Sequence, residues 1–227
     1  MRRAFVTTLI TLVLATAAHA HFVFVVPDAT GNSAKAVFSE DLEPDAAVDI
    51  AGIAPTKLYV RATGQGDAPI EWKKGEHEFT FTIPGSGQRT VFGTTNYGVM
   101  QRGATKPFLL QYHPKSLIGD FGTFQPLGDA VPVEVIPEKT NGAIRFAVLA
   151  RGKPLANADA TILVPGEKAK KVKTDDKGHT PEFKATGQYG VWARFAEPTA
   201  GEHGGKKYEE IRHYATLVVT FGSTVQK

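Results

Sequence analysis

The fold is decided by a stretch of 31 residues, which reads YGVWARFAEP (189–198), TAGEHGG (199–205) and KKYEEIRHYATLVV (206–219). Its two outer runs are rich in β-branched and aromatic residues, which favour extended backbone. Proline and several glycines interrupt the sequence between them, as is typical of a hairpin loop. The stretch therefore predicts a long β-hairpin, and it also carries Glu202, His203 and His213.

The rest of the chain repeats this pattern on a smaller scale. Helical periodicity is almost absent, and short strand-like runs alternate with turn signals, so we predict an all-β protein. Residues 40–53 predict a loop with a turn of helix, and Pro114 predicts the end of the strand before it, with a loop over 115–128. Further strands are expected at residues 21–26, 35–39, 57–61, 70–73, 77–83, 90–99 (bulged at its glycines), 108–112, 131–137, 143–150, 158–164 and 181–184.

A change of composition near residue 138 predicts two β-sandwich domains. The strand 131–137 is bracketed by prolines, and the polar run 138–142 that follows it has the composition of a linker. We expect an N-terminal domain over 21–137 and a C-terminal domain over 138–227. About seven strands in about 85 residues are typical of an immunoglobulin-like or transthyretin-like sandwich.

Residues 1–20 have the features of a secretory signal peptide. Arg2 and Arg3 precede a short apolar run, and Ala18-His19-Ala20 matches a cleavage site, so cleavage is expected after Ala18 or Ala20. We therefore expect a periplasmic or secreted protein without a membrane span in the mature chain. The sequence contains no cysteine, which excludes disulfides, thiol catalysis and thiolate-bound metals.

Composition and motifs exclude several classes of function. Without Arg2 and Arg3, the 26 basic residues fall to 24 against 23 acidic ones, so nucleic-acid binding is not expected. The chain has no G-x-S-x-G, H-E-x-x-H or phosphate-loop motif. We therefore predict a protein that is not an enzyme.

The mature sequence resembles a known family along nearly its whole length, 21–227. The residues that carry the resemblance include His21-Phe22, Phe38-Ser39-Glu40, Tyr97-Gly98-Val99, Pro107-Phe108-Leu109-Leu110 and Arg212-His213-Tyr214-Ala215. They are similar to an exported bacterial family of unknown function, many of whose members are named as periplasmic components of nickel or cobalt uptake. The resemblance implies export, two β-domains and the handling of a divalent transition metal, with a membrane metal transporter as a partner. The second half also resembles transthyretin-like and carboxypeptidase-regulatory-like modules through Gly152-Lys153-Pro154-Leu155 and Gly187-Gln188-Tyr189.

The mature N-terminus is the most specific candidate metal site in the sequence. Cleavage after Ala20 leaves His21 with a free α-amine, and this amine and the imidazole Nδ1 can chelate one copper, nickel or zinc ion. Cleavage after Ala18 instead leaves His19-Ala20-His21, in which a histidine at position three can complete a square plane around Cu(II) or Ni(II). A plain strand residue next to a cleavage site remains the alternative interpretation.

Three further residues complete the predicted metal site: His213, His203 and Glu202. His213 lies on the apolar face of its predicted strand, where a histidine is either a ligand or a hydrogen-bonded core residue. His203 and Glu202 lie in a glycine-rich loop that could fold around an ion or could only turn. His77, His113 and His179 are scattered along the sequence and are interpreted as structural.

Two functions from different classes follow from the sequence. The first is a periplasmic protein that binds or delivers nickel, cobalt or copper through His21 with His213 or His203. The second is a scaffold or adhesion module of the cell envelope that binds no metal. Stoichiometric uptake of Cu(II) or Ni(II) would distinguish the first from the second.

Overall fold

The structure is a computed structural model that describes residues 21–120, 122 and 124–222, so the predicted signal peptide lies outside the described residues. The regular secondary structure of the described chain is almost all β-strand, with short 3₁₀ turns such as η1 (Ile50–Ile53) and η3 (Gly128–Ala130). The prediction of an all-β protein is therefore confirmed. Within these residues, no helix is both long and apolar enough to cross a membrane.

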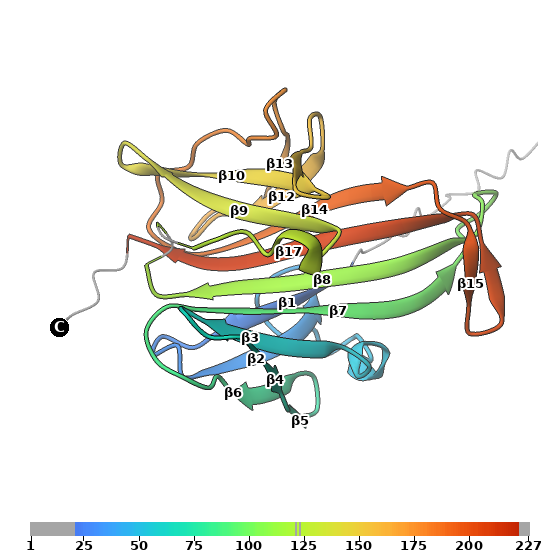
Figure 1. Cartoon of the computed structure of the whole chain (residues 1–227), viewed down its shortest axis with the longest axis horizontal. Helices are drawn as coiled ribbons and strands as arrows, with labels where there is room; N and C mark the ends of the chain where they lie inside the picture. Colours follow the sequence, from blue (N-terminus) through green and yellow to red (C-terminus); the bar gives the residue numbers. More distant parts are fainter. Residues whose placement is uncertain (1–20, 121, 123, 223–227) are drawn as a thin grey trace, which may run out of the picture.

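An eight-stranded sheet forms the centre of the molecule (Figure 1). Its strands lie in the order β13 (Lys170–Lys173), β12 (Asp159–Leu163), β14 (Gly187–Glu197), β17 (Glu210–Phe221), β8 (Phe108–Ile118), β7 (Arg89–Met100), β3 (Lys57–Ala62) and β4 (Asp67–Ile70). The predicted long hairpin is present as β14 and β17, which pair antiparallel from Gly187–Phe221 to Glu197–Ile211. β17 pairs with β8 in parallel, whereas the other neighbours in this sheet are antiparallel.

Two smaller sheets and a hairpin complete the fold. One sheet has the order β1 (Phe22–Pro27), β2 (Ser33–Ser39), β6 (Phe79–Thr82) and β5 (Lys73–Lys74). The other has the order β11 (Lys153–Pro154), β10 (Ala143–Ala150) and β9 (Val133–Thr140). The hairpin of β15 (Gly201–His203) and β16 (Lys206–Tyr208) interrupts the loop between β14 and β17 and projects from one end of the molecule in Figure 1.

The two small sheets cover opposite faces of the large sheet, as the side chains of β17 show. Ala215, Leu217 and Val219 belong to the hydrophobic cluster that also contains Val133 of β9. Val218 points the other way and belongs to the cluster around β1. Successive side chains of a strand point to opposite faces, so the two clusters lie on opposite faces of the same strand.

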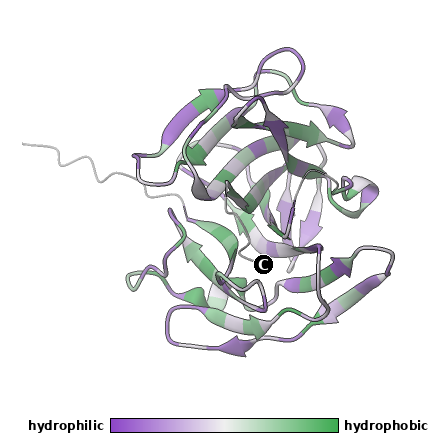
Figure 2. Ribbon diagram, turned by 90° about the vertical axis from the view of Figure 1, so that its left-hand side faces the viewer, coloured by the Kyte–Doolittle hydropathy of each residue, from purple (hydrophilic) through white to green (hydrophobic). Residues whose placement is uncertain are grey.

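Aromatic rings fill much of the core between the large sheet and β1. Phe22 stacks on Trp192 at 4.3 Å between ring centroids and lies 5.3 Å from Tyr214. On this same face, Thr216 Oγ1 donates a 2.6 Å hydrogen bond to the carbonyl oxygen of Val23. Figure 2 shows hydrophobic residues mainly in the strands and hydrophilic ones mainly in the loops and turns.

The predicted domain boundary near residue 138 lies inside β9. The polar run 138–142 forms the end of β9 and the turn into β10, because Thr140 and Ala143 are paired. Moreover, the large sheet joins β8 from the first half to β17 from the second half. The division into separate domains stays a prediction.

Two local predictions are confirmed and two are wrong. The bulge predicted in residues 90–99 is present as a register shift between Asn96 and Gly98, and the helical turn predicted in 40–53 is η1. Pro114 does not end its strand, because β8 continues to Ile118 and the predicted loop begins later. A proline in β8 is tolerated where the pairing with β7 is interrupted, between Phe92–Lys115 and Thr95–Tyr112. Residues 181–184 form only an isolated bridge, through Phe183 and Ile144.

Gly93 is expected to be the most sensitive glycine of the large sheet. A Cβ at this position would clash with the carbonyl oxygen of Lys57 and would come within 2.7 Å of Leu58 Cδ2. The Gly93→Ala variant should therefore lower the free energy of unfolding by about 1–3 kcal/mol, as overpacking does. Urea denaturation followed by tryptophan fluorescence measures this change.

The matched control is Gly66→Ala in the β3–β4 turn. A Cβ at Gly66 meets no atom within 4 Å. The alanine should leave the stability unchanged or raise it by less than about 1 kcal/mol, because it restricts the unfolded chain. Equal effects of the two substitutions would contradict the close approach of β3 to β7.

Candidate functional site

His21 lies directly before β1, with its ring held on two sides. Its Nε2 lies 2.9 Å from Asp45 Oδ2, and its ring centroid lies 5.6 Å from that of Phe38. A carboxylate only accepts hydrogen bonds, so Nε2 carries the hydrogen and donates it to Asp45. The other ring nitrogen, Nδ1, makes no hydrogen bond to any residue in the described part of the chain.

His213 lies on the other face of the large sheet from β1. Its neighbour Tyr214 contacts Phe22 of β1, whereas the His213 ring stacks on Phe195 at 5.7 Å. Alternation along β17 therefore directs His213 away from the side on which β1 and His21 lie. The structure thus does not bring His21 and His213 together.

Glu202 and His203 lie on β15, in the projecting hairpin. Their cross-strand partners are Lys207 and Lys206 of β16. A cation would meet two lysines beside these two side chains, which is unfavourable for metal binding. Over residues 21–120, 122 and 124–222, no group of three or more His, Asp or Glu residues is arranged to hold a metal ion.

His213 instead contacts His113, a histidine that we predicted to be structural. His113 Nε2 lies 3.1 Å from His213 Nδ1. The chain of contacts continues on both sides: Thr94 Oγ1 lies 3.2 Å from His113 Nδ1, and His213 Nε2 lies 3.1 Å from Glu197 Oε2. Arg151 closes it with hydrogen bonds of 2.8 and 3.0 Å to the carboxylate of Glu197.

These contacts form the histidine chain, which we define as Thr94, His113, His213, Glu197 and Arg151. It crosses the strands β7, β8, β17 and β14 and ends in the turn between β10 and β11. His113 and His213 are 3% and 2% exposed, so water does not compete for their ring nitrogens. No local pattern predicts this pairing, because it depends on the parallel register of β8 and β17, about 100 residues apart.

Both histidines of the chain are held in the neutral form. Burial lowers the pKa of His113 to about 3, helped by the nearby His213 and Arg151. Burial also lowers the pKa of His213, although Glu197 acts in the opposite direction. Burial alone would raise the pKa of Glu197, but hydrogen bonds from Arg151 and His213 outweigh it, and the net pKa is lowered.

A buried ion pair lies next to the histidine chain on the same face of β8. Lys115 Nζ lies 2.6 Å from Glu134 Oε1 of β9, and both side chains are about 5% exposed. The same carboxylate accepts two 3.0 Å hydrogen bonds from the backbone N–H of Leu127. Burial lowers the pKa of Lys115, and Glu134 opposes that shift. The pair fixes β9 and the segment before it on the large sheet.

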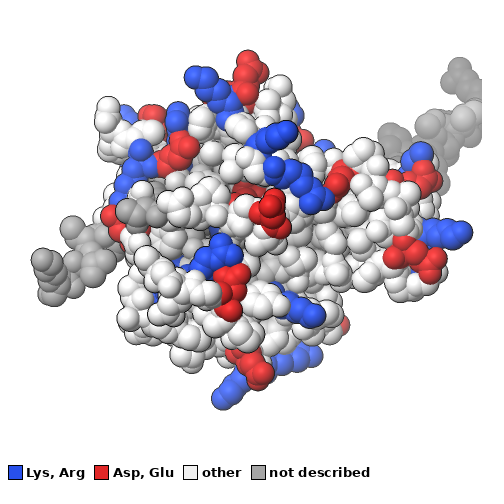
Figure 3. All heavy atoms as spheres, viewed as in Figure 1, with Lys and Arg blue, Asp and Glu red and all other residues white. Residues whose placement is uncertain are grey.

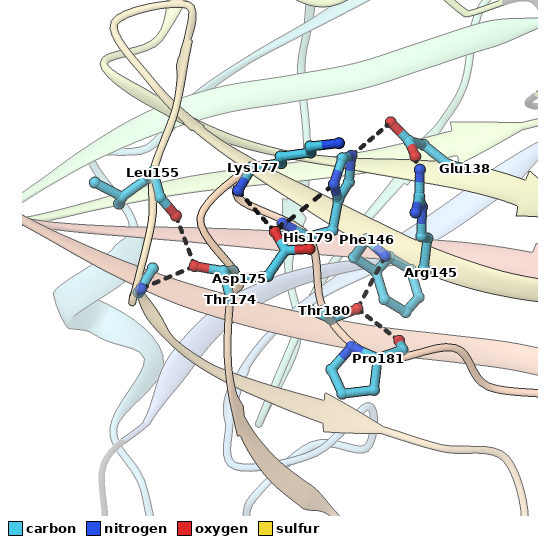
Figure 4. A network of polar contacts seen from close by, with 11 residues as sticks. Glu138, Arg145, Phe146, Leu155, Thr174, Asp175, Lys177, His179, Thr180 and Pro181 are labelled. Carbon is cyan, nitrogen blue, oxygen red and sulfur yellow. Dashed lines mark hydrogen bonds and ion pairs between the residues drawn. The ribbon is translucent and has the colours of Figure 1, made fainter.

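A second histidine network lies on the outer side of the small sheet of β9 and β10 (Figure 4). His179 Nε2 lies 3.3 Å from Glu138 Oε1, and Glu138 also accepts a 2.8 Å hydrogen bond from Arg145 Nε. His179 Nδ1 is buried without a hydrogen bond, 3.8 Å from Asp175 Oδ1. The carboxylate of Asp175 accepts two backbone N–H groups, so this network closes the Asp-Lys-Gly turn.

A groove of about 890 Å³ runs over the ends of β1, β2 and β6. Its charged residues are mixed in sign, with Lys35 and Lys73 close to Glu43, Glu71 and Asp28. On the face in Figure 3, Lys and Arg likewise alternate with Asp and Glu. None of the residues predicted as metal ligands lines this groove.

Comparisons with known proteins do not identify a family. No family model matches the chain, and no curated protein matches it. Pullulanase type I from Bacillus subtilis, solved in complex with maltose, is 13% identical over 87% of this chain and 25% of that chain, with a TM-score of 0.18. The BSP domain of a biofilm-associated protein is 12% identical over 89% of this chain and 30% of that chain, with a TM-score of 0.20. The chain thus spans under a third of either protein, and likenesses this weak carry no argument about fold or function.

Proposed function

We propose that the protein binds a divalent transition metal, Cu(II), Ni(II) or Co(II), at His21 and serves in the uptake or delivery of that metal in the periplasm. The observation that carries the proposal is the contact between His21 Nε2 and Asp45 Oδ2 at 2.9 Å. Histidines that ligate metals usually donate their other ring N–H to a carboxylate, which fixes the ring and raises its basicity.

The contact with Asp45 selects the ring nitrogen that binds the metal. Because Nε2 is engaged, Nδ1 is the ligand, and Nδ1 is the nitrogen that can form a chelate with the α-amine of the same residue. If cleavage occurs after Ala18 instead, the square-planar site also uses the imidazole of His21. Cleavage after Ala18 and cleavage after Ala20 are therefore both expected to place the metal on the imidazole of His21.

The small number of ligands suits delivery. His203, Glu202 and His213 lie elsewhere in the fold, so His21 with its amine supplies two nitrogens, and water or a partner protein supplies the rest. The His21 side chain is 18% exposed and that of Asp45 is 34% exposed, so a partner can reach the ion. A metal transporter in the membrane is the partner that the proposal implies.

Metal titration of three variants tests the proposal. In the mature protein that begins at His21, His21→Ala removes the imidazole Nδ1 ligand and should abolish stoichiometric Cu(II) and Ni(II) binding. Asp45→Asn should weaken binding by about tenfold to 100-fold, as loss of an outer-shell carboxylate does. His203→Ala should bind as the parent does. Binding is measured by isothermal titration calorimetry with a competing chelator.

Two outcomes would contradict the proposal. If the His21→Ala protein binds as tightly as the parent, the ion is held elsewhere. If the parent takes up neither metal at micromolar concentration, the protein is not a metal carrier, and a scaffold or adhesion role in the cell envelope becomes the better account.

A further inference from the structure

The histidine chain has a single consistent arrangement of hydrogens when both imidazoles are neutral. Glu197 only accepts, so His213 Nε2 carries the hydrogen and its Nδ1 is an acceptor. His113 Nε2 must then donate to that Nδ1, which leaves His113 Nδ1 as an acceptor for the hydroxyl of Thr94. Each of the three contacts has one donor and one acceptor.

One added proton can be taken up without the loss of any of these bonds. A protonated His213 donates through Nε2 to Glu197 and through Nδ1 to His113 Nε2. His113 then carries its own hydrogen on Nδ1 and donates it to Thr94 Oγ1, since a hydroxyl both donates and accepts. The direction of two hydrogen bonds is reversed, and the chain stays complete.

A second proton cannot be accommodated. It would place an N–H of His113 opposite an N–H of His213 across the 3.1 Å contact. The charged groups around this contact are Arg151 and Glu197, with the Lys115–Glu134 pair next along β8 and β9. Two imidazolium ions and Arg151 would then face the single carboxylate of Glu197, and like charges in a buried site repel strongly.

We propose that the histidine chain acts as an acid-operated latch. It binds one proton without losing any of its hydrogen bonds. When it binds a second proton, the Arg151 turn and the small sheet of β9, β10 and β11 are released from the large sheet. The histidine chain lies where the small sheet packs against the large sheet. Arg151 N donates a 2.9 Å hydrogen bond to the carbonyl of Pro132, directly before β9, so release of this turn loosens the edge of the small sheet. The inference does not depend on metal binding at His21.

Hydrogen exchange at single amides tests the latch in the full mature protein. Between pH 6 and pH 4, protection of the Arg151 and Leu155 amides should fall by about tenfold per pH unit, after correction for intrinsic exchange rates. The amides of β3, which lies outside the histidine chain, should stay better protected than these two at every pH, because they exchange only on global unfolding. Unchanged protection at Arg151, or protection at Arg151 equal to that of β3 at every pH, would overturn the proposal.

The variant His113→Gln separates the latch from the titration of carboxylates. Glutamine can accept from Thr94 and donate to His213 but takes up no proton, so Arg151 should stay protected at pH 4.5. His77→Gln is the control, because His77 is partly exposed and lies outside the chain, and it should behave as the parent does. If His113→Gln does not fold, ¹⁵N chemical shifts of the parent decide. They should show His213 protonated before His113, and a pKa near 6.5 for His113 would refute the latch.

Discussion

Replacing Glu134 with alanine is expected to lower the free energy of unfolding by about 3–5 kcal/mol, because it leaves Lys115 as an unpaired charge in the interior. Lys115 and Glu134 are each 5% exposed, and their charged atoms lie 2.6 Å apart. The backbone N–H of Leu127 also loses its acceptor. Urea denaturation at pH 7, followed by the fluorescence of the two tryptophans, measures the loss.

Two further variants distinguish the ion pair from a general effect of mutation. The double variant Lys115→Met/Glu134→Leu removes both charges and should recover much of the lost stability, because apolar residues of similar volume often replace buried pairs well. Lys173→Ala breaks the exposed pair with Asp159 and should cost less than about 1 kcal/mol. A loss below about 1 kcal/mol for Glu134→Ala would show that Lys115 reaches water or another partner.

Acidification from pH 7 to pH 5 is expected to destabilise the protein by about 2 kcal/mol through His113 alone. Its pKa is lowered from 6.5 to about 3 on folding, so the folded state binds fewer protons than the unfolded state. This stabilisation is complete above pH 6.5 and is lost as the pH falls towards 3, at about 1.4 kcal/mol per pH unit. His213 adds to the loss in the same direction, since its pKa is lowered as well.

Urea denaturation of the parent and of His113→Gln at pH 7, 6 and 5 measures this dependence. The variant should lose markedly less stability than the parent over the same range, because only His213 of the pair still titrates. The account of the histidine chain would be wrong if parent and variant lost stability in parallel, or if neither changed between pH 7 and pH 5.

Local patterns predicted much of the secondary structure. The alternation of apolar and polar residues located β3 to within a residue, the mostly apolar run 143–150 located β10, and the predicted hairpin appears as β14 and β17. Pro114 led to a wrong strand end. A proline disrupts a strand only where the strand needs the backbone N–H that proline lacks, and the hydrogen-bonded pairing of β7 with β8 is interrupted at Pro114.

The parts that sequence could not predict depend on contacts between distant residues. The parallel pairing of β8 with β17 joins segments about 100 residues apart, and no local pattern specifies it. That pairing brings His113 to His213 and puts His213 on the opposite face from β1. The sequence therefore identified His213 as unusual but assigned it the wrong neighbours. Lys115 was missed for a similar reason, since a lysine is rarely buried unless a distant carboxylate pairs with it.

The central claim, a metal ion held by His21, is tested most directly by the intact mass of the mature protein isolated from the periplasm with its metal retained. The account predicts a chain that begins at His21, or at His19 if cleavage occurs earlier, with close to one copper, nickel or cobalt ion bound. A metal-free protein that also fails to take up Cu(II) or Ni(II) at micromolar concentration would contradict it.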